Sequence, residues 1–323
     1  MSKKILVTGG AGYIGSHIVH DLIELDYDVT ILDNLSKGEM INVHPSSNFI
    51  EGDVRDEKVL SKIFSKGIDV VFHFAALKAA GESMFVPHEY ANNNIFGTLQ
   101  LLSKMKEYNV NYFVFSSSAA VYGSPVKLPI DEQHPVKPIN YYGYTKLAIE
   151  ENLAWFSQLT NLKYAALRYF NATGYDVKKR IKGKEKNPAN LCPIIMEVLS
   201  GERKDMQVFG NDYDTPDGTC IRDYVHVNDL ASAHIKALEY ITSENKNLVV
   251  NLGTGNGYSV LDLINAAEKV SGKKVNYRIS ERRAGDPASL VADFSLANKL
   301  IDWKAEYSSP EQIFESMLPV YFK

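Results

Sequence analysis

Three glycines near the start of the chain constrain its fold more than any other feature. Gly9, Gly12 and Gly15 lie between a β-branched run at 5–8 and a helical pattern near 16–25. This spacing lets the backbone turn tightly and approach a pyrophosphate closely, while the helix that follows directs free N–H groups at the phosphates. A glycine pattern alone is weak, but its place between a strand and a helix indicates a dinucleotide site.

The stretches that follow alternate between strand-like and helix-like patterns over the first half of the chain. Further strands are predicted at 29–32, 48–51, 70–74, 112–116 and 164–168, and long helices at 88–108 and 142–160. The run at 70–74 is mostly apolar, which is typical of a strand buried on both faces. Repeated strand–helix units of this length predict an α/β fold with a doubly wound parallel sheet and right-handed crossovers.

The pattern changes after about residue 172. Loops rich in Gly, Asn, Asp and Lys occupy 174–190 and 210–219. Shorter elements are predicted at 207–209, 228–240, 248–252 and 260–271. We therefore expect two domains without a flexible linker: a Rossmann domain over 1–172 and a smaller α/β substrate domain over 173–323, interleaved near the active site.

A second glycine-rich loop, at 251–257, also follows a predicted strand. Its glycines alternate, and no carboxylate ends a following strand as Asp33 does in the first half. Ser259 and Asp262 after it have the spacing of a helix capping box. We interpret this loop as structural.

Charge and composition exclude several classes of protein. A net charge of −4 and a pI of about 6.1 argue against a nucleic-acid or membrane-surface protein. The basic run at 178–186 is interpreted as a solvated loop. The eight histidines are scattered and predict no metal site. Only two cysteines, Cys192 and Cys220, and no apolar run of about 18 residues favour a soluble, cytoplasmic protein.

Carboxylates and small residues at the ends of predicted strands indicate which dinucleotide binds. Asp33 ends the second strand, where a carboxylate binds the adenosine ribose hydroxyls and repels a 2′-phosphate, so NAD is favoured over NADP. The alternative is a turn aspartate before Asn34. Asp53, after the third strand, suits the adenine edge. Phe74 and the two alanines after it let a cofactor cross the sheet edge at the switch point.

The richest chemical motif is Tyr142-Gly-Tyr-Thr-Lys146. Tyr142 and Lys146 are four residues apart and share one helix face. An ammonium group beside a phenol, together with a positive nicotinamide ring, would lower the phenol pKa. Ser118 ends the preceding strand and can hydrogen-bond the same substrate oxygen. Tyr141 and Tyr144 lie nearby, but neither has a lysine four residues later.

Ordered blocks along the chain resemble one family. The chain is similar to the extended short-chain dehydrogenases/reductases, and among them to the UDP-glucose 4-epimerases, in TGGAGYIGSH, LDNLSKG, EGDVRD, VFHFAALKAAGES, FSSSAAVYG, YYGYTK, LRYFNATG, VFGNDYDTPDGTCIRDYVHVNDLA, NLGTGNGYSVLDL and RRAGDPA. The resemblance implies that catalysis depends on Ser118, Tyr142 and Lys146. It implies an NAD site made of these three with Gly9, Gly12, Tyr13, Ile14, Gly15, Asp33, Asn34, Leu35, Ser36, Lys37, Asp53, Val54, Phe74, Ala75, Ala76, Leu77, Lys78, Asn93, Tyr169 and Phe170.

The same resemblance implies a UDP-sugar site. Its residues are Lys78, Ser118, Tyr142, Asn171, Asn190, Leu191, Phe209, Arg222, Tyr224, Arg283 and Asp286. The two arginines can clamp a diphosphate through the fork geometry of the guanidinium group, and Asp286 can accept ribose hydroxyls.

The resemblance also implies a reaction, the interconversion of UDP-galactose and UDP-glucose in galactose metabolism. Tyr142 would take the proton of the sugar 4-hydroxyl as hydride passes to NAD. A 4-keto intermediate would then turn over and receive the hydride on its opposite face. The family implies a homodimer formed through 88–108 and 142–160.

Other readings stay open. Sugar-nucleotide dehydratases have Asp-Glu after the catalytic hydroxyl residue, where this chain has Ala119 and Ala120. Decarboxylases place Glu, and most 4-epimerases Thr, at position 120. Leu290 is intermediate in bulk at a position that limits N-acetylated sugars in related epimerases, so a UDP-GlcNAc/UDP-GalNAc 4-epimerase or a bifunctional enzyme is an alternative. A non-enzymatic alternative is a dinucleotide-sensing regulatory protein, which would have no reason to keep Ser118, Tyr142 and Lys146 together.

Overall fold

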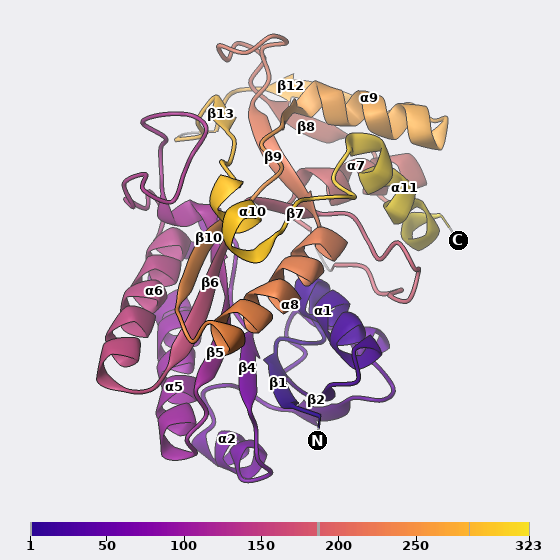
Figure 1. The fold of residues 1–323 in the computed structure, drawn as a ribbon. Coiled ribbons are helices and arrows are strands. Elements are labelled where there is room, and N and C mark those ends of the chain that lie inside the picture. Colours follow the sequence, from indigo (N-terminus) through magenta and orange to yellow (C-terminus); the bar gives the residue numbers. More distant parts are fainter. Residues whose placement is uncertain (1, 186–187, 284, 323) are drawn as a thin grey trace.

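A large parallel sheet forms the centre of the protein. The computed structural model describes residues 2–185, 188–283 and 285–322. Within these residues the large sheet has seven strands in the order β10-β6-β5-β4-β1-β2-β3, and every neighbouring pair is parallel (Figure 1). The strands are β1 (Lys4–Thr8), β2 (Asp28–Asp33), β3 (Asn48–Glu51), β4 (Val70–His73), β5 (Tyr112–Ser118), β6 (Lys163–Tyr169) and β10 (Leu248–Leu252). The predicted α/β class and doubly wound sheet are confirmed.

Alternating side chains of the strands build a separate apolar core on each face of this sheet. Ile5 and Val7 of β1 pack in one core, and Leu6 between them packs in the other, as the two-residue period of a strand requires. The first core is covered by α1 (Tyr13–Glu24), α8 (Val227–Ser243) and α10 (Ser295–Ile301). The second is covered by α2 (Glu57–Phe64), α5 (Gly97–Glu107) and α6 (Tyr141–Leu159), as Figure 1 shows.

A smaller α/β region lies beyond the carboxyl ends of the large sheet (Figure 1). Three helices share its core: α7 (Leu191–Ser200), α9 (Val260–Ser271) and α11 (Pro310–Tyr321). Strand β8 (Met206–Phe209) packs with them and pairs in parallel with the exposed β12 (Tyr277–Ser280). Strand β9 (Ile221–His226) pairs with β7 (Asn171–Thr173), β11 (Gly257–Ser259) and β13 (Ser289–Leu290). The short helices are η1 (Met40–Asn42), α3 (Ala80–Ser83), α4 (Pro87–Tyr90) and η3 (Ala119–Val121).

Two features of the helices and strands differ from the sequence prediction. The helix predicted at 88–108 is interrupted, because α4 and α5 are separated by a π-helical segment, η2 (Ala91–Phe96). The strand at Leu248–Leu252 was expected in the second domain, but it forms the edge of the large sheet beside β6. The division of the chain at residue 172 stays a prediction. Two elements that follow residue 172, β10 and α8, pair or pack with the large sheet.

The second glycine-rich loop has the structural setting that the sequence predicted. Ser259 and Asp262 form the capping box that begins α9. The fully buried carboxylate of Asp223 accepts hydrogen bonds from the backbone N–H groups of Thr254 and Gly255, at 2.8 and 3.1 Å. In the part of the chain that the structure describes, no helix has both the length and the apolar character needed to cross a bilayer.

Candidate active site

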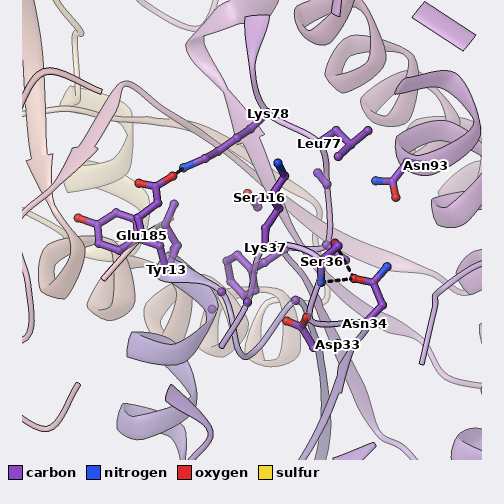
Figure 2. Close-up of a pocket in the computed structure, with 18 of the residues that line it drawn as sticks. Tyr13, Asp33, Asn34, Ser36, Lys37, Leu77, Lys78, Asn93, Ser116 and Glu185 are labelled. Atoms are coloured by element: carbon purple, nitrogen blue, oxygen red, sulfur yellow. Dashed lines mark hydrogen bonds and ion pairs between the residues drawn. The ribbon is translucent and has the colours of Figure 1, made fainter. Parts of the chain in front are cut away.

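A pocket opens at the carboxyl ends of the strands of the large sheet (Figure 2). It lies where the strand order reverses between β1 and β4, the position at which doubly wound sheets bind their ligands. Of the predicted site residues, the following line it: Gly9, Gly12, Tyr13, Ile14, Gly15, Asp33, Asn34, Ser36, Lys37, Asp53, Val54, Phe74, Ala75, Ala76, Leu77, Lys78, Asn93, Tyr142, Lys146, Tyr169 and Asn190.

The glycine loop fits a group that must approach the backbone closely. Gly9 has φ +73°, and a Cβ there would lie 2.6 Å from the backbone nitrogen of Ala75. A Cβ at Gly15 would lie 2.3 Å from the carbonyl oxygen of Gly9. Helix α1 begins with Gly12 as its N-cap and has no side-chain cap, so its first N–H groups face the pocket without a competing side chain. This arrangement is an anion cradle for a pyrophosphate.

Asp33 presents a buried carboxylate at the end of β2. Its Oδ2 accepts the backbone N–H of Ala11 at 3.0 Å, and its Oδ1 accepts that of Leu35 at 2.9 Å. Burial raises the pKa of Asp33, and the two backbone hydrogen bonds oppose this shift. The two backbone donors hold both oxygens at the pocket wall, where the sequence predicted a ribose contact.

Asp53 also lines the pocket, but a neighbour that the sequence analysis did not identify holds it. The guanidinium group of Arg55 donates to both carboxylate oxygens of Asp53, each at 2.7 Å, and Asn34 donates to Oδ2 at 3.0 Å. The hydrogen bonds from Arg55 lower the pKa of Asp53 to about 2. Asp53 therefore stays ionised at neutral pH and keeps its acceptors aligned.

Tyr142 and Lys146 lie together in the pocket, as their spacing predicted. Lys146 Nζ is 5.8 Å from the centroid of the Tyr142 ring and donates to the carbonyl oxygen of Ser116 at 2.6 Å. Burial lowers the pKa of Lys146 to about 7, and the charge of Glu150 opposes this shift. Burial raises the pKa of Tyr142, and a hydrogen bond with Ser118 opposes that shift. In the protein without its cofactor, burial outweighs this hydrogen bond and the pKa of the Tyr142 phenol is raised; the lower pKa expected from the sequence depended on the nicotinamide ring as well as on the lysine.

Local capping fixes the start of the helix that carries Tyr142. Asn140 caps α6 by accepting the N–H of Gly143 at 2.8 Å. Ser83 of α3 accepts the N–H of Tyr142 at 3.0 Å. A Cβ on Gly143 would lie 2.4 Å from the carbonyl oxygen of Ala120, so η3 packs directly against the first turn of α6. Sequence spacing could not identify Ser83, because it acts from 59 residues away.

The π-helical segment presents a buried amide that the sequence analysis also missed. Asn94 is fully buried and accepts the N–H of Leu77 at 2.9 Å. Its own amide nitrogen donates to Leu77 O and to Thr145 Oγ1, each at 3.0 Å. Asn93 beside it donates to Asn94 and faces the pocket. Asn94 therefore ties the pocket wall to the helix that carries the tyrosine and the lysine.

The predicted UDP-sugar residues gather mostly in a second cluster outside the pocket lining. Arg222 of β9 donates to Asp286 at 2.6 Å, and the guanidinium group of Arg283 lies 4.0 Å from the centroid of the Phe209 ring. The four residues of these two contacts were all predicted to bind the UDP-sugar. In this structure Arg222 and Asp286 form an ion pair with each other. The predicted residues that do not line the pocket are Leu35, Ser118, Phe170, Asn171, Leu191, Phe209, Arg222, Tyr224, Arg283 and Asp286.

Helix α7 and strand β7 lie between this second cluster and the pocket. Asn190 is the N-cap of α7 and lines the pocket, and Leu191 after it packs in the same apolar core as Tyr224. Asn171 of β7 pairs in register with Tyr224 of β9. Helix α7 therefore joins the pocket lining to the core of the second region, and β7 pairs with the strand that carries Arg222.

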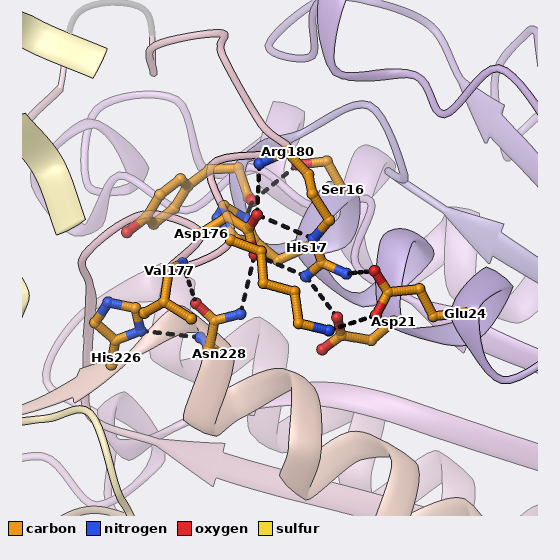
Figure 3. Close-up of polar contacts among 11 residues, drawn as sticks. Ser16, His17, Asp21, Glu24, Asp176, Val177, Arg180, His226 and Asn228 are labelled. Carbon is orange, nitrogen blue, oxygen red and sulfur yellow. Dashed lines mark hydrogen bonds and ion pairs between the residues drawn. The ribbon is translucent and has the colours of Figure 1, made fainter. Parts of the chain in front are cut away.

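Arg180 anchors the loop that follows β7, as Figure 3 shows. Its guanidinium group pairs with Asp21 at 2.6 Å and Glu24 at 2.7 Å in α1, and with Asp176 at 2.7 Å. The predicted solvated loop at 178–186 is therefore wrong for Arg180, whose side chain is only 15% exposed. Lys186 of this run lies outside the described residues. Farther along the loop, Glu185 forms an ion pair with Lys78 at the pocket (Figure 2).

The fold and this site define a dinucleotide-binding Rossmann protein that has a tyrosine and a lysine in the cofactor pocket. The chain belongs to the NAD dependent epimerase/dehydratase family, whose model matches residues 5–253. The family resemblance found in the sequence is confirmed.

Relatives and solved structures agree over nearly the whole chain. The chain is 47% identical to the UDP-glucose 4-epimerase of Halalkalibacterium halodurans, covering 96% of this chain and 93% of that protein. It is similar to the crystal structure of UDP-glucose 4-epimerase from Brucella ovis in complex with NAD, with 40% identity, a TM-score of 0.96 and coverage of 99% and 98%. It is also similar to the UDP-Glc/GlcNAc 4-epimerase from Campylobacter jejuni, with 39% identity, a TM-score of 0.87 and 99% coverage of both chains.

Proposed function

We propose that the protein is an NAD-dependent UDP-glucose 4-epimerase that interconverts UDP-galactose and UDP-glucose through a transient 4-keto sugar. The observation that carries this proposal is the presence of Tyr142 and Lys146 in the same pocket as the glycine loop and Asp33. Named relatives at 42–47% identity support it. The paired catalytic and cofactor residues also favour an enzyme over a dinucleotide sensor, which would need only the cofactor residues.

The pocket fits a dinucleotide. Gly9 and Gly15 leave no room for a Cβ, so a flat backbone surface faces the position of the pyrophosphate. The first turn of α1 would bind the phosphates, and Asp33 would accept the adenosine ribose hydroxyls. When bound, NAD supplies a hydride acceptor that later returns the hydride, so the reaction needs no external oxidant or reductant.

Tyr142 is the proposed acid–base group. It would take the proton from the sugar 4-hydroxyl and return it to the 4-oxygen of the epimer, so one proton is moved twice and the overall reaction is balanced. Ser118, which shares a hydrogen bond with Tyr142, would hold the same sugar oxygen. Protonated Lys146 would stabilise the phenolate, and the Ser116 carbonyl fixes the position of its ammonium group.

The second cluster is the proposed nucleotide anchor of the substrate. Arg222 and Arg283 would bind the diphosphate, and Phe209, under the Arg283 guanidinium group, gives that side chain a fixed platform. Asp286 would accept ribose hydroxyls, and its ion pair with Arg222 holds both groups in place. Anchoring the nucleotide at a distance from Tyr142 leaves the sugar free to turn over between the two hydride transfers.

A direct assay tests this function. The purified protein, without added reductant or oxidant, is incubated with UDP-galactose, and the products are separated by chromatography. We expect conversion to an equilibrium mixture with UDP-glucose. Unchanged UDP-galactose in the presence of saturating NAD would contradict the epimerase and favour the sensor.

The alternative substrate pair is UDP-GlcNAc and UDP-GalNAc. Leu290 bears on this choice because it lies in β13 in register with Arg222 of the second cluster. It packs against a small apolar cluster made of Val121, Tyr122 and Ile130. One of the similar solved structures is a UDP-Glc/GlcNAc 4-epimerase, which favours testing both pairs on one preparation. Conversion of UDP-GlcNAc at a comparable kcat/KM would make the enzyme bifunctional, and loss of that conversion in Leu290→Tyr would assign the selectivity to this position.

The protein is also proposed to work as a cytoplasmic homodimer. Helix α6 exposes Trp155 and Leu159, at 62% and 75%, on the element for which the family implied a dimer contact. Apolar side chains on one exposed helix favour association with a second copy. Light scattering tests this directly: we expect twice the 36.1 kDa mass of one chain, and Trp155→Lys should yield the single chain. Both cysteines are free thiols, which suits a reducing compartment.

A further inference from the structure

A buried carboxylate lies on the same helix face as the proposed acid–base pair. Tyr142, Lys146 and Glu150 follow one another at four-residue intervals in α6, so their side chains share one face of the helix. Glu150 is 6% exposed, and its carboxylate accepts a hydrogen bond from Ser117. Ser117 lies in β5 between Ser116, whose carbonyl binds Lys146, and Ser118. Glu150 therefore contacts the strand that holds both partners of the acid–base pair.

An arginine on the neighbouring strand fixes this carboxylate from the other side. Arg168 Nε donates to both oxygens of Glu150, at 3.0 and 3.1 Å, and its terminal nitrogen donates to Oε2 at 2.5 Å. A second terminal nitrogen donates to Tyr122 Oη at 3.0 Å, and Tyr122 donates to Asn251 Oδ1 at 2.6 Å. This chain of contacts is buried, so it holds one geometry and is weakly screened by salt.

We propose that Glu150 is a positioning residue for the acid–base pair: fixed by Arg168 and Ser117, its negative charge stabilises the ammonium form of Lys146, and this ammonium favours the phenolate of Tyr142 in the NAD-bound enzyme. This proposal rests on the proposed function, because it assigns how the same tyrosine and lysine are prepared for proton transfer. Glu150 touches neither substrate nor cofactor in this account. It acts through Lys146.

The charges around Tyr142 and Lys146 favour a protonated lysine. Burial alone favours the neutral amine of Lys146, and the charge of Glu150 is the contribution that raises the Lys146 pKa. His73 also faces Lys146, but burial lowers the His73 pKa to about 3, so its ring is neutral. Tyr142 also faces the lysine, whose Nζ lies 5.8 Å from the centroid of its ring. Glu150 therefore favours the ammonium form of Lys146, and that positive charge favours the phenolate of Tyr142.

The groups around Glu150 hold its carboxylate in place and add no further negative charge at neutral pH. Arg168 and Ser117 donate to it, and its charge in turn raises the pKa of Tyr164 and of Tyr122. Burial also contributes to both tyrosine shifts and is their largest cause. Both phenols therefore stay protonated at neutral pH and add no negative charge near the pair.

The test measures the titration of Tyr142 in the NAD-bound enzyme. The tyrosinate absorbance is followed against pH, with Tyr142→Phe as the spectral reference. Glu150→Gln should move the midpoint upward by about half a pH unit or more, because the ammonium that stabilises the phenolate is weakened. At neutral pH, kcat should fall several-fold with KM nearly unchanged. Glu150→Asp keeps the charge and should return the midpoint toward that of the original protein.

A matched control separates positioning from stability. Asp229 is a buried carboxylate in α8 that binds the N–H groups of Glu306 and Tyr307, away from the pocket lining. Asp229→Asn should lower Tm and leave the Tyr142 midpoint unchanged. The proposal is overturned if Glu150→Gln lowers Tm with an unchanged midpoint, or if Asp229→Asn moves the midpoint as much.

A second variant covers the case in which Glu150→Gln does not fold. Glu150→Met combined with Arg168→Met replaces the buried ion pair by apolar groups of similar volume, a change that proteins often tolerate. The midpoint should still rise, and an unchanged midpoint overturns the proposal. The activity of the unmodified protein on UDP-galactose tests the proposed function separately, because it does not depend on the Tyr142 midpoint of the variants.

Discussion

The side-chain nitrogen of Lys146 lies 5.8 Å from the centroid of the Tyr142 ring, and both residues line a pocket that the glycine loop also lines. Burial acts on the two groups in opposite senses: it lowers the lysine pKa and raises the tyrosine pKa. Without a further positive charge, both groups therefore tend toward their neutral forms. We infer that a positive nicotinamide ring beside Tyr142 would favour its phenolate form and so oppose the effect of burial on the phenol.

The Lys146 shift predicts a pH dependence of stability. The folded pKa of about 7 is below the ordinary value of 10.5, so above pH 7 the unfolded chain binds more protons than the folded chain. Stability from this group therefore rises with pH between about 7 and 10, and Lys146→Met should lack this rise. Urea unfolding of the cofactor-free protein at several pH values measures the difference. Parallel curves for the two proteins would contradict the shift.

Asp33 predicts the choice between the two nicotinamide dinucleotides. Replacing Asp33 by Asn keeps its size but removes the charge that ribose hydroxyls bind, so the Kd for NAD should rise about tenfold. The Kd for NADP should fall, because a 2′-phosphate no longer meets a carboxylate. Calorimetric titration with each dinucleotide gives both values. An unchanged ratio of the two Kd values would show that Asp33 does not face the ribose.

The close packing around Gly15 leaves no room for a larger side chain in the glycine loop. Its Cβ would lie 2.3 Å from the Gly9 carbonyl oxygen, so Gly15→Ala should reduce the free energy of unfolding by about 2 to 3 kcal/mol and weaken NAD binding. Gly81→Ala is the matched control, since a Cβ at Gly81 meets nothing within 4 Å. Equal denaturation midpoints for the two variants would refute the close packing of this loop.

The ion pairs of Arg180 should affect both the stability of the fold and the retention of NAD. Removing the guanidinium group in Arg180→Met leaves the buried carboxylate of Asp176 without its cation, at a cost of about 3 kcal/mol. Because Glu185 of the same loop lines the pocket, NAD should also dissociate faster in a stopped-flow displacement assay. Lys178→Met removes one exposed ion pair with Glu24 and should change both measurements little. Comparable losses in the two variants would contradict the anchor.

The sequence predicted those features that depend on local spacing. The glycine loop, Asp33 at the end of a strand, and Tyr142 with Lys146 on one helix face were all visible, because each pattern is set within a few residues. In the structure these residues line one pocket. The predicted parallel sheet and the predicted protein family are both confirmed.

Features that depend on tertiary packing could not be predicted from local spacing. Arg168 forms an ion pair with Glu150 across 18 residues, and Ser83 holds the start of α6 from 59 residues away, without any repeating pattern that marks either contact. Strand β10 joins the large sheet although it follows the second-domain elements, because its apolar side chains complete the core beside β6. The anchoring of Arg180 also went unseen, since charge runs in sequence look alike whether solvated or buried.

The central claim is that the phenol of Tyr142 moves the sugar proton. The most direct measurement compares kcat for UDP-galactose in Tyr142→Phe and in Tyr144→Phe, with bound NAD quantified in both; Tyr144 lies on the same helix but is 49% exposed and has no lysine four residues later. We predict a loss of about 10²- to 10⁴-fold for Tyr142→Phe with NAD retained, and near-normal turnover for Tyr144→Phe. Turnover by Tyr142→Phe at the rate of the unmodified protein would contradict the account.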